Sequence, residues 1–288
     1  MTAAAEDIYS DRLLSEAAEQ LRRAGIESPR REARLLLALA LDTEPGNLIM
    51  RTLSVSPSQS QRFGNLVRRR SRREPFAHLR GSREFWSLTF HVSPDVLIPR
   101  PESETLIECA LREFPDRDRT LRVLDLGTGT GCLLLTFLAE RPAATGTGCD
   151  LSDAALSIAE SNAKNLGLWA RARFERSDWT AGISGKFDVI FANPPYIATP
   201  EVSALNPEVG QYEPRMALDG GADGLDAFRR IAAQLRRVAA SDATLFAEIG
   251  PAQAGIVADL FSAQGWEHIS TVPDLAGTPR CVVMRVNG

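Results

Sequence analysis

The chain has 288 residues, of which 44% are hydrophobic and 24% charged, and its formal net charge is −4. This length favours two domains, and this composition is typical of a soluble globular protein rather than a disordered or membrane protein. The longest aliphatic run, Leu35 to Leu41, is far too short to span a bilayer, and the acidic start lacks the basic and apolar regions of a signal peptide. We therefore expect a cytoplasmic protein with no membrane role.

Charge is distributed unevenly along the chain. Residues 1–85 carry 15 arginines and 11 acidic residues, so this segment is at +4 and the remainder at −8. The arginine run, which we define as Arg68, Arg69, Arg70, Arg72 and Arg73, has the charge to bind phosphates. No aromatic residues interleave with it to stack bases, so we interpret it as a solvated helix end whose role stays open. The four cysteines stand far apart without a Cys-x-x-Cys pair, and the sequence predicts neither a metal site nor a disulfide framework.

The first part of the chain has the pattern of a small helical bundle. Apolar residues recur at three- and four-residue intervals over residues 11–24, 30–41 and 57–73, with glycine and proline breaks between these segments. Residues 85–92 and 96–98 are then rich in aromatic and β-branched side chains, and Ser93-Pro94-Asp95 separates them. This pattern predicts a short hairpin at the domain junction.

From residue 102 onward, helical and strand patterns alternate. Strands are predicted over residues 122–126, 145–150, 171–177, 187–192, 244–249, 266–272 and 281–286, and helices over residues 102–114, 131–140, 152–166, 224–240 and 252–263. Such alternation predicts a doubly wound α/β domain, whose mostly parallel sheet is covered on both faces. We thus expect a helical domain over residues 1–84, a hairpin linker over 85–100 and an α/β domain over 101–288. Ligands of such domains bind beyond the carboxyl ends of the strands.

A glycine-rich loop follows the first predicted strand of the α/β domain. We define this glycine loop as Gly127, Thr128, Gly129, Thr130 and Gly131. Glycines let the backbone approach a ligand closely and take positive φ where the chain turns sharply. The spacing lacks the third glycine of Gly-x-Gly-x-x-Gly and the Gly-Lys-Ser/Thr ending of a P-loop. The loop therefore disfavours NAD(P) and ATP.

Acidic and aromatic residues follow the next two strands. Asp150 ends the second strand twenty-five residues after Asp125, where a carboxylate in such folds accepts hydrogen bonds from ribose hydroxyls. With the glycine loop, this position favours an adenosine without phosphates over a simple helix cap at Asp150. Asp178 and Trp179, just past the third strand, are candidates to flank the adenine, the ring by stacking and the carboxylate by accepting from the amino group.

The most specific motif is Asn193-Pro194-Pro195-Tyr196, which follows a buried strand and reaches the same sheet edge. Each proline fixes its own φ and restricts the residue before it, so the segment is held extended and stiff. The side-chain oxygen of Asn193 and the carbonyl of Pro194 can then converge on one NH2 group, while Tyr196 offers a flat face for stacking. Accepting both hydrogens of the NH2 group would orient a nitrogen whose lone pair is delocalised toward an electrophile. Asn193, Pro194 and Tyr196 are thus the catalytic candidates.

The glycine loop followed by Asn-Pro-Pro-Tyr resembles the class I methyltransferases that act on planar NH2 groups of DNA adenine, RNA guanine or protein glutamine. Further matches make nearly the whole chain similar to the release factor glutamine methyltransferase (HemK-type) family. These matches are residues 81–86, 96–104, 220–225, 248–250 and 274–277, together with Arg280.

The resemblance implies a seven-stranded sheet with one reversed strand at its edge, and S-adenosyl-L-methionine as cofactor with S-adenosyl-L-homocysteine as product. It implies that the residues matching Gly127–Gly131, Asp150, Trp179 and Asn193 bind the cofactor. It also implies that Asn193–Tyr196 hold the glutamine of a Gly-Gly-Gln motif in peptide chain release factors, with the N-terminal domain helping to dock this partner.

Other functions stay open on the sequence alone. These are glutamine methylation of a ribosomal protein, N-methylation of a nucleic-acid base, and a cofactor-binding adaptor without activity. The chain is acidic overall and lacks a recognisable base-reading module, so direct nucleic-acid binding is not expected. The stretch over residues 97–101 is expected to border the active cleft. Arg100 is equally suited to a structural ion pair with Glu102 or Glu104, so we leave it off the catalytic candidates.

Overall fold

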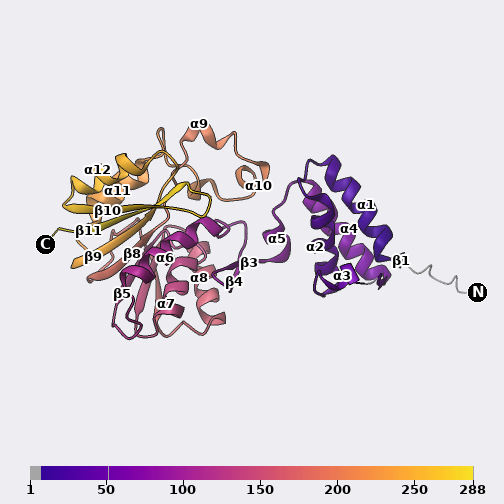
Figure 1. Ribbon diagram of the computed structural model, residues 1–288, viewed down its shortest axis with the longest axis horizontal. Helices are drawn as coiled ribbons and strands as arrows, with labels where there is room; N and C mark the ends of the chain where they lie inside the picture. The colour runs from indigo at the N-terminus through magenta and orange to yellow at the C-terminus, as the bar shows by residue number, and fades with distance from the viewer. Residues whose placement is uncertain (1–7, 51, 288) are drawn as a thin grey trace, which may run out of the picture. The chain divides into compact units, whose positions relative to one another are not determined.

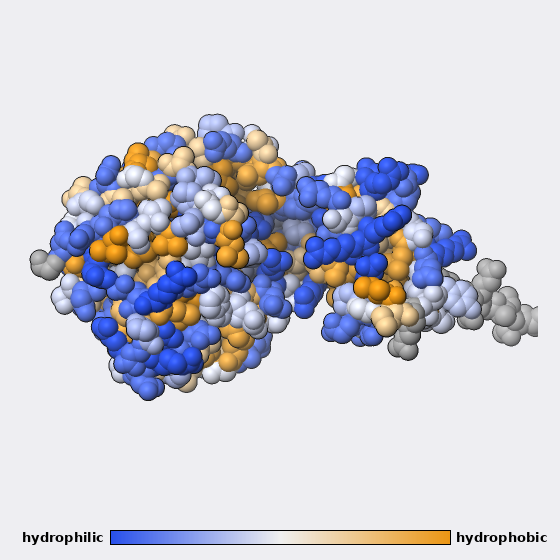
Figure 2. Space-filling model, in the orientation of Figure 1, coloured by the Kyte–Doolittle hydropathy of each residue, from blue (hydrophilic) through white to orange (hydrophobic). Residues whose placement is uncertain are grey.

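The computed structural model describes residues 8–50 and 52–287, which form two compact units (Figure 1). The helical unit contains the residues up to Arg80 together with Pro207–Tyr212, and the α/β unit contains Gly81–Asn206 and the residues from Glu213 onward. Hydrophilic residues cover much of the visible surface of each unit, with apolar residues scattered among them (Figure 2). Within the described ranges, no helix has both the length and the apolar character needed to cross a membrane.

The helical unit is built on three helices that pack on one another, α1 (Ser10–Arg23), α2 (Pro29–Leu41) and α4 (Pro57–Ser71). Their bounds agree with the predicted ranges to within two residues. Their apolar stripes form a core that includes Leu21, Leu36, Leu37 and Phe63. Shorter elements complete the unit: β1 (Ile8–Tyr9), α3 (Asn47–Met50), β2 (Ser54–Val55), α5 (Phe76–Arg80) and α10 (Pro207–Gly210).

The arginine run lies at the end of α4, but it is not a solvated helix end throughout. The Arg70 side chain is buried and donates to Glu32 at 2.9 Å and to Glu208 at 3.0 Å. Arg73 also donates to Glu208, at 2.7 Å, and Arg69 bonds Glu74. Glu32 and Glu208 lie 38 and 138 residues from Arg70 in the sequence, which explains why the pattern of the run alone did not reveal these partners. Much of its charge is therefore neutralised within the helical unit.

The hairpin of the α/β unit differs from the predicted one. Its strands are β3 (Ser82–Phe85) and β4 (Leu88–His91), joined by Trp86 and Ser87, which both have positive φ (51° and 60°). The predicted strand over residues 85–92 was therefore wrong, and residues 96–98 form no strand. Tertiary contacts fix a turn that lacks the usual glycine or asparagine, since Trp86 donates its backbone N–H to Glu104 and its ring N–H to Glu140.

Seven strands form the sheet of the α/β unit. They are β5 (Arg122–Leu126), β6 (Thr145–Asp150), β7 (Ala172–Arg176), β8 (Phe187–Ala192), β9 (Ala239–Glu248), β10 (Trp266–Pro273) and β11 (Pro279–Val286), in the order β10-β11-β9-β8-β5-β6-β7. Among the described residues, β11 runs antiparallel to both of its neighbours, β9 and β10, and the other strand pairs of this sheet are parallel. The expectation of a reversed strand at the edge was wrong in its position: β11 returns from β10 through a tight connection and lies between β9 and the edge strand β10.

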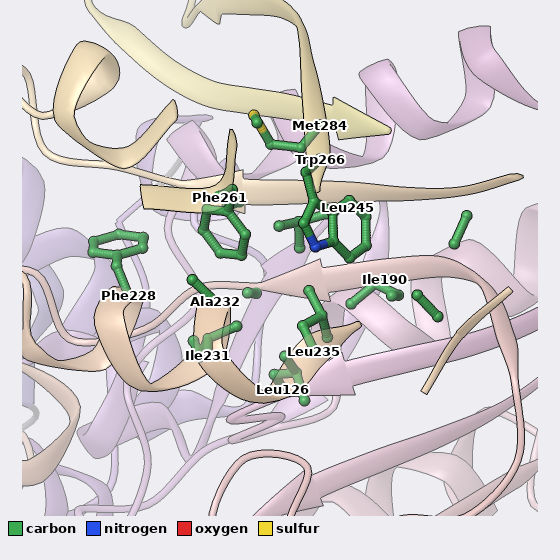
Figure 3. Packing of buried hydrophobic residues seen from close by; sticks show 14 of the residues in the cluster. Leu126, Ile190, Phe228, Ile231, Ala232, Leu235, Leu245, Phe261, Trp266 and Met284 are labelled. Atoms are coloured by element: carbon green, nitrogen blue, oxygen red, sulfur yellow. The ribbon is translucent and has the colours of Figure 1, made fainter. Parts of the chain in front are cut away.

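Successive residues of the central strands point to opposite faces of the sheet, and each face has its own core. Val123, Val189 and Phe246 pack with α6 (Glu104–Glu113) and α7 (Cys132–Glu140). Ile190 and Leu245 pack on the other face with α11 (Asp226–Leu235) and α12 (Ala254–Ser262), as Figure 3 shows. The remaining helices are α8 (Asp153–Asn165), α9 (Thr199–Val202), and the 3-10 turns η1 (Pro101–Ser103) and η2 (Arg215–Ala217). Burial on both faces makes the sheet a rigid platform for its carboxyl edge.

Candidate active site

A cavity of about 640 Å³ opens at the carboxyl edge of the sheet in the α/β unit. Its wall includes most of the residues singled out in the sequence: Gly127, Thr128, Gly129, Thr130, Asp150, Asp178, Trp179, Asn193 and Pro195. Six aspartates and two arginines contribute to the wall, so acidic side chains outnumber basic ones there, although Asp178, Asp219 and Asp226 are each paired with an arginine. A cavity of this size and charge suits a cationic small molecule.

The glycine loop forms the floor of the cavity because its glycines take a conformation that other residues resist. Gly127, Gly129 and Gly131 have φ values of 70°, 53° and 80°. At Gly129 a Cβ atom would meet nothing closer than 4.0 Å, so this backbone faces open space. Gly131 does not line the cavity; a Cβ there would come within 3.1 Å of Leu135 and 3.3 Å of Ala159. Its role in this structure is the close packing of α7 on α8.

Asp150 holds the glycine loop in place. One of its carboxylate oxygens accepts from the backbone N–H of Gly129 at 3.0 Å, and the other accepts from that of Ser152 at 2.9 Å. Ser152 in turn caps α8 by accepting from Ala155. Each carboxylate oxygen has a further lone pair, so Asp150 can bind a ligand hydroxyl while it keeps the loop ordered.

A second aspartate, Asp125, lies buried beneath the loop. It accepts a hydrogen bond of 2.6 Å from the Thr128 hydroxyl, so this hydroxyl is already engaged within the protein. Burial raises the pKa of Asp125 to about 7, against the lowering effect of the Thr128 hydrogen bond. The carboxyl group is therefore neutral in the folded protein at pH values where an exposed aspartate is ionised.

This pKa shift predicts a pH-dependent stability. Between about pH 4 and pH 7 the unfolded chain has lost the Asp125 proton while the folded chain keeps it, so the free energy of unfolding falls as pH rises and levels off above pH 7. Asp125→Asn introduces a side chain that cannot ionise. Between pH 5 and pH 8 the free energy of unfolding of this variant should therefore fall by about 2 kcal/mol less than that of the parent. Urea unfolding at both pH values measures the difference. Equal losses for the two proteins would contradict a raised Asp125 pKa.

Asp178 and Trp179 occupy the cavity wall in different ways. Asp178 is paired with Arg230 of α11, so its carboxylate is already engaged. Trp179 has a positive φ of 56°, an uncommon backbone conformation for a large residue. Its ring lies near Gly127, where a Cβ atom would come within 3.6 Å of it, and its buried indole N–H has no hydrogen-bond acceptor among the residues that the structure describes. The strained backbone directs this ring against the glycine loop.

Asn193 follows β8 and presents an unused acceptor. Its side-chain NH2 donates to the Ser103 hydroxyl at 3.2 Å, which leaves its Oδ1 oxygen without a donor in the described part of the chain. The neighbouring Pro194 is buried, and its carbonyl oxygen also receives no hydrogen bond from the described residues. Asn193 is half-buried, so its Oδ1 oxygen is accessible, and two adjacent acceptors without protein donors can serve a ligand that donates twice.

Tyr196 does not line the cavity, in contrast to the stacking surface expected from the sequence. Its hydroxyl donates to the buried Glu248 carboxylate at 3.2 Å, and its ring packs against the core. Burial raises the pKa values of both Tyr196 and Glu248 above their ordinary ranges. The Tyr196 backbone is enclosed as well, since Gly224 has a φ of 77° and a Cβ atom there would approach the Tyr196 carbonyl oxygen to 2.4 Å.

The sequence did not identify three residues that organise the site. Ser103 bonds Asn193, Glu248 bonds Tyr196, and Ser103 and Glu248 bond each other. The third residue is Glu213. Arg100 pairs with Glu213 at 2.5 Å rather than with Glu102 or Glu104, and Glu213 also accepts from the Ile98 backbone. Ser103 and Glu248 lie within segments that carried the family resemblance, which was the one available signal for them.

Comparisons with known proteins agree with this geometry. Residues 12–81 match the PrmC N-terminal domain, and residues 103–206 match the methyltransferase small domain. A release factor glutamine methyltransferase of Rhodospirillum rubrum is 42% identical over 95% of this chain and 84% of its own length. Another, of Cereibacter sphaeroides, is 44% identical over 95% of this chain and 97% of its own.

Solved structures are similar in fold at lower identity. A methyltransferase of Pyrococcus furiosus covers 71% of this chain and 91% of its own at 15% identity, with a TM-score of 0.51. A ribosomal protein L11 methylase of Lactobacillus delbrueckii subsp. bulgaricus covers 66% of this chain and 81% of its own at 17% identity, with a TM-score of 0.50. These likenesses identify the α/β unit as a class I methyltransferase fold.

Proposed function

Because the chain belongs to the release factor glutamine methyltransferase family, we propose that it methylates the side-chain amide nitrogen (N5) of the glutamine in the Gly-Gly-Gln motif of peptide chain release factors. The methyl donor is S-adenosyl-L-methionine, and S-adenosyl-L-homocysteine is released. The helical unit contributes to docking of the release factor.

The observation that carries this proposal is the pair of free acceptors beside the cavity. The Oδ1 oxygen of Asn193 and the carbonyl oxygen of Pro194 lack donors within the described residues, and an amide NH2 has two hydrogens to give. A primary amide nitrogen is a weak nucleophile because its lone pair is delocalised. Holding both hydrogens orients this nitrogen, restrains its rotation and stabilises the positive charge that develops on it. The proton can leave to water after transfer, so no general base is required beforehand.

The cavity fits the proposed cofactor. The open backbone at Gly129 and the Asp150 carboxylate suit the adenosine part, and the Trp179 ring suits its base. The acidic wall suits a positively charged group. When bound, the cofactor supplies an electrophilic methyl group on a sulfonium. Because Asp178 is already paired with Arg230, its carboxylate must use one of its remaining lone pairs to accept a hydrogen bond from the adenine amino group.

A labelling assay tests the proposed function. The full-length protein is incubated with methyl-labelled S-adenosylmethionine and, in separate reactions, a release factor, a release factor with its Gly-Gly-Gln glutamine replaced by alanine, ribosomal proteins, DNA and RNA. We expect label on the intact release factor alone. Label on nucleic acid or ribosomal protein, or label that persists after the glutamine is replaced, would overturn the assignment.

A further inference from the structure

Glu248 is a buried carboxylate beside the Asn-Pro-Pro-Tyr motif. It ends β9 next to the end of β8, since Ala247 pairs with Ala192 immediately before Asn193. Only 1% of its surface is exposed. The Ser103 hydroxyl donates to one carboxylate oxygen at 2.5 Å, and the Tyr196 hydroxyl donates to the other at 3.2 Å. The Glu248 carboxylate thus bonds Tyr196, the last residue of the motif, and also Ser103, whose hydroxyl contacts Asn193, the first residue of the motif.

The chemistry of these groups gives the hydrogen-bond chain a direction. Burial raises the pKa of Glu248, whereas hydrogen bonds from Ser103 and Tyr196 and the charge of Arg280 favour its ionised form. In the ionised form the carboxylate only accepts, so the single hydroxyl hydrogen of Ser103 is committed to it. The Ser103 oxygen can then only accept on its other side, where the Asn193 side chain approaches to 3.2 Å. Asn193 must therefore turn its NH2 toward Ser103. Its Oδ1 oxygen is left for the cavity, whose wall includes both Asn193 and Ser103.

We propose that Glu248, acting through Ser103, is a positioning residue that sets which end of the Asn193 amide faces the substrate. The two ends of an amide have nearly the same shape, so packing alone discriminates poorly between them. With the amide reversed, its NH2 would face the NH2 of the substrate, and two donors would meet without an acceptor. This inference rests on the proposed function, because it assumes an NH2 substrate.

Substitutions that reverse or remove the hydrogen bonds from Asn193 through Ser103 to Glu248 test the proposal. In Ser103→Ala, Asn193 loses the acceptor that orients it. In Glu248→Gln, the new NH2 group can donate to the Ser103 oxygen, which frees the serine hydroxyl to donate to Asn193 and favours the reversed amide. For both variants we expect kcat to fall by roughly 10- to 100-fold with the release factor, while the Kd for S-adenosylhomocysteine changes less than about twofold.

A conservative variant separates positioning from general structure. Ser103→Thr keeps the hydroxyl and should recover most of the turnover that Ser103→Ala loses. Ser262→Ala and Glu267→Gln make the same kinds of change at exposed residues that do not line the cavity, and they serve as matched controls. Thermal unfolding identifies any variant that fails to fold; should Glu248→Gln do so, the comparison of Ser103→Ala with Ser103→Thr carries the test.

The outcomes distinguish this inference from the proposed function. Parental kcat in both Ser103→Ala and Glu248→Gln would overturn the positioning role, as would an equal loss of kcat in Ser103→Thr and Ser103→Ala. A parent protein that leaves the release factor unlabelled would instead overturn the proposed function itself. Loss of turnover with intact cofactor binding, together with recovery in Ser103→Thr, is the result the inference predicts.

Discussion

Asn193→Ala is expected to lower kcat with the release factor by about 1,000-fold, the largest effect of any single substitution in the site. The substitution removes the Oδ1 acceptor that, in the proposed complex, holds one hydrogen of the substrate NH2 and stabilises charge as the nitrogen reacts. It leaves the glycine loop and the Asp150 carboxylate unchanged, so the Kd for S-adenosylhomocysteine should stay within a few fold of the parent value. Single-turnover methylation and calorimetric titration measure the two quantities.

Asn165→Ala is the matched control for this substitution, because Asn165 is exposed at the end of α8. It should methylate the release factor at the parental rate. Near-parental turnover in Asn193→Ala would contradict the role in which the Asn193 Oδ1 oxygen accepts a hydrogen of the substrate amide. A large loss of cofactor affinity without a change in saturated turnover would reassign Asn193 to cofactor binding alone.

Asp150→Ala is expected to raise the Kd for S-adenosylhomocysteine by about 100-fold. The Asp150 carboxylate orders the loop through Gly129 and caps the next segment through Ser152, and in the proposed complex it also accepts from the ribose. Loss of two or three such hydrogen bonds at about 1 kcal/mol each gives an effect of this size. Calorimetric titration measures the affinity, and turnover at saturating cofactor should fall much less.

Asp259→Ala, at an exposed position of α12, is the control for this second substitution. It should bind S-adenosylhomocysteine with the parental Kd. An Asp150→Ala protein with unchanged affinity would show that the carboxylate only orders the free loop and contributes nothing to the bound state.

Regular elements were predictable from the sequence because their signals are local. The three-to-four-residue spacing around Leu21, Leu36 and Phe63 predicted the helices of the helical unit. The alternation of helix and strand patterns predicted the doubly wound sheet. The Trp86–Ser87 turn could not be predicted, because contacts from Glu104 and Glu140 fix a backbone conformation that the local sequence does not favour. The order of the strands in the sheet could not be predicted either, because the alternation of helix and strand patterns shows only which elements follow one another in the sequence.

The site shows the same division between local and distant information. The glycine loop, Asp150 and Asn193 could be identified because short motifs place them at one sheet edge, and the structure brings them to one cavity. Tyr196 was expected to face the substrate, but its partner Glu248 lies fifty-two residues further along the chain and turns its hydroxyl inward. Hydrogen bonds between side chains far apart in sequence leave no periodic signal, so Ser103 and Glu248 required the structure.

In the proposed complex, the Asn193 and Pro194 oxygens accept both hydrogens of one amide NH2. A crystal structure with S-adenosylhomocysteine and a release factor, or a peptide containing its Gly-Gly-Gln motif, would show whether they do. We expect the glutamine amide nitrogen at about 3 Å from both oxygens, with the amide plane beside the cofactor sulfur. A glutamine bound elsewhere in the cavity, or an Asn193 side chain that turns its NH2 toward the glutamine, would contradict this expectation.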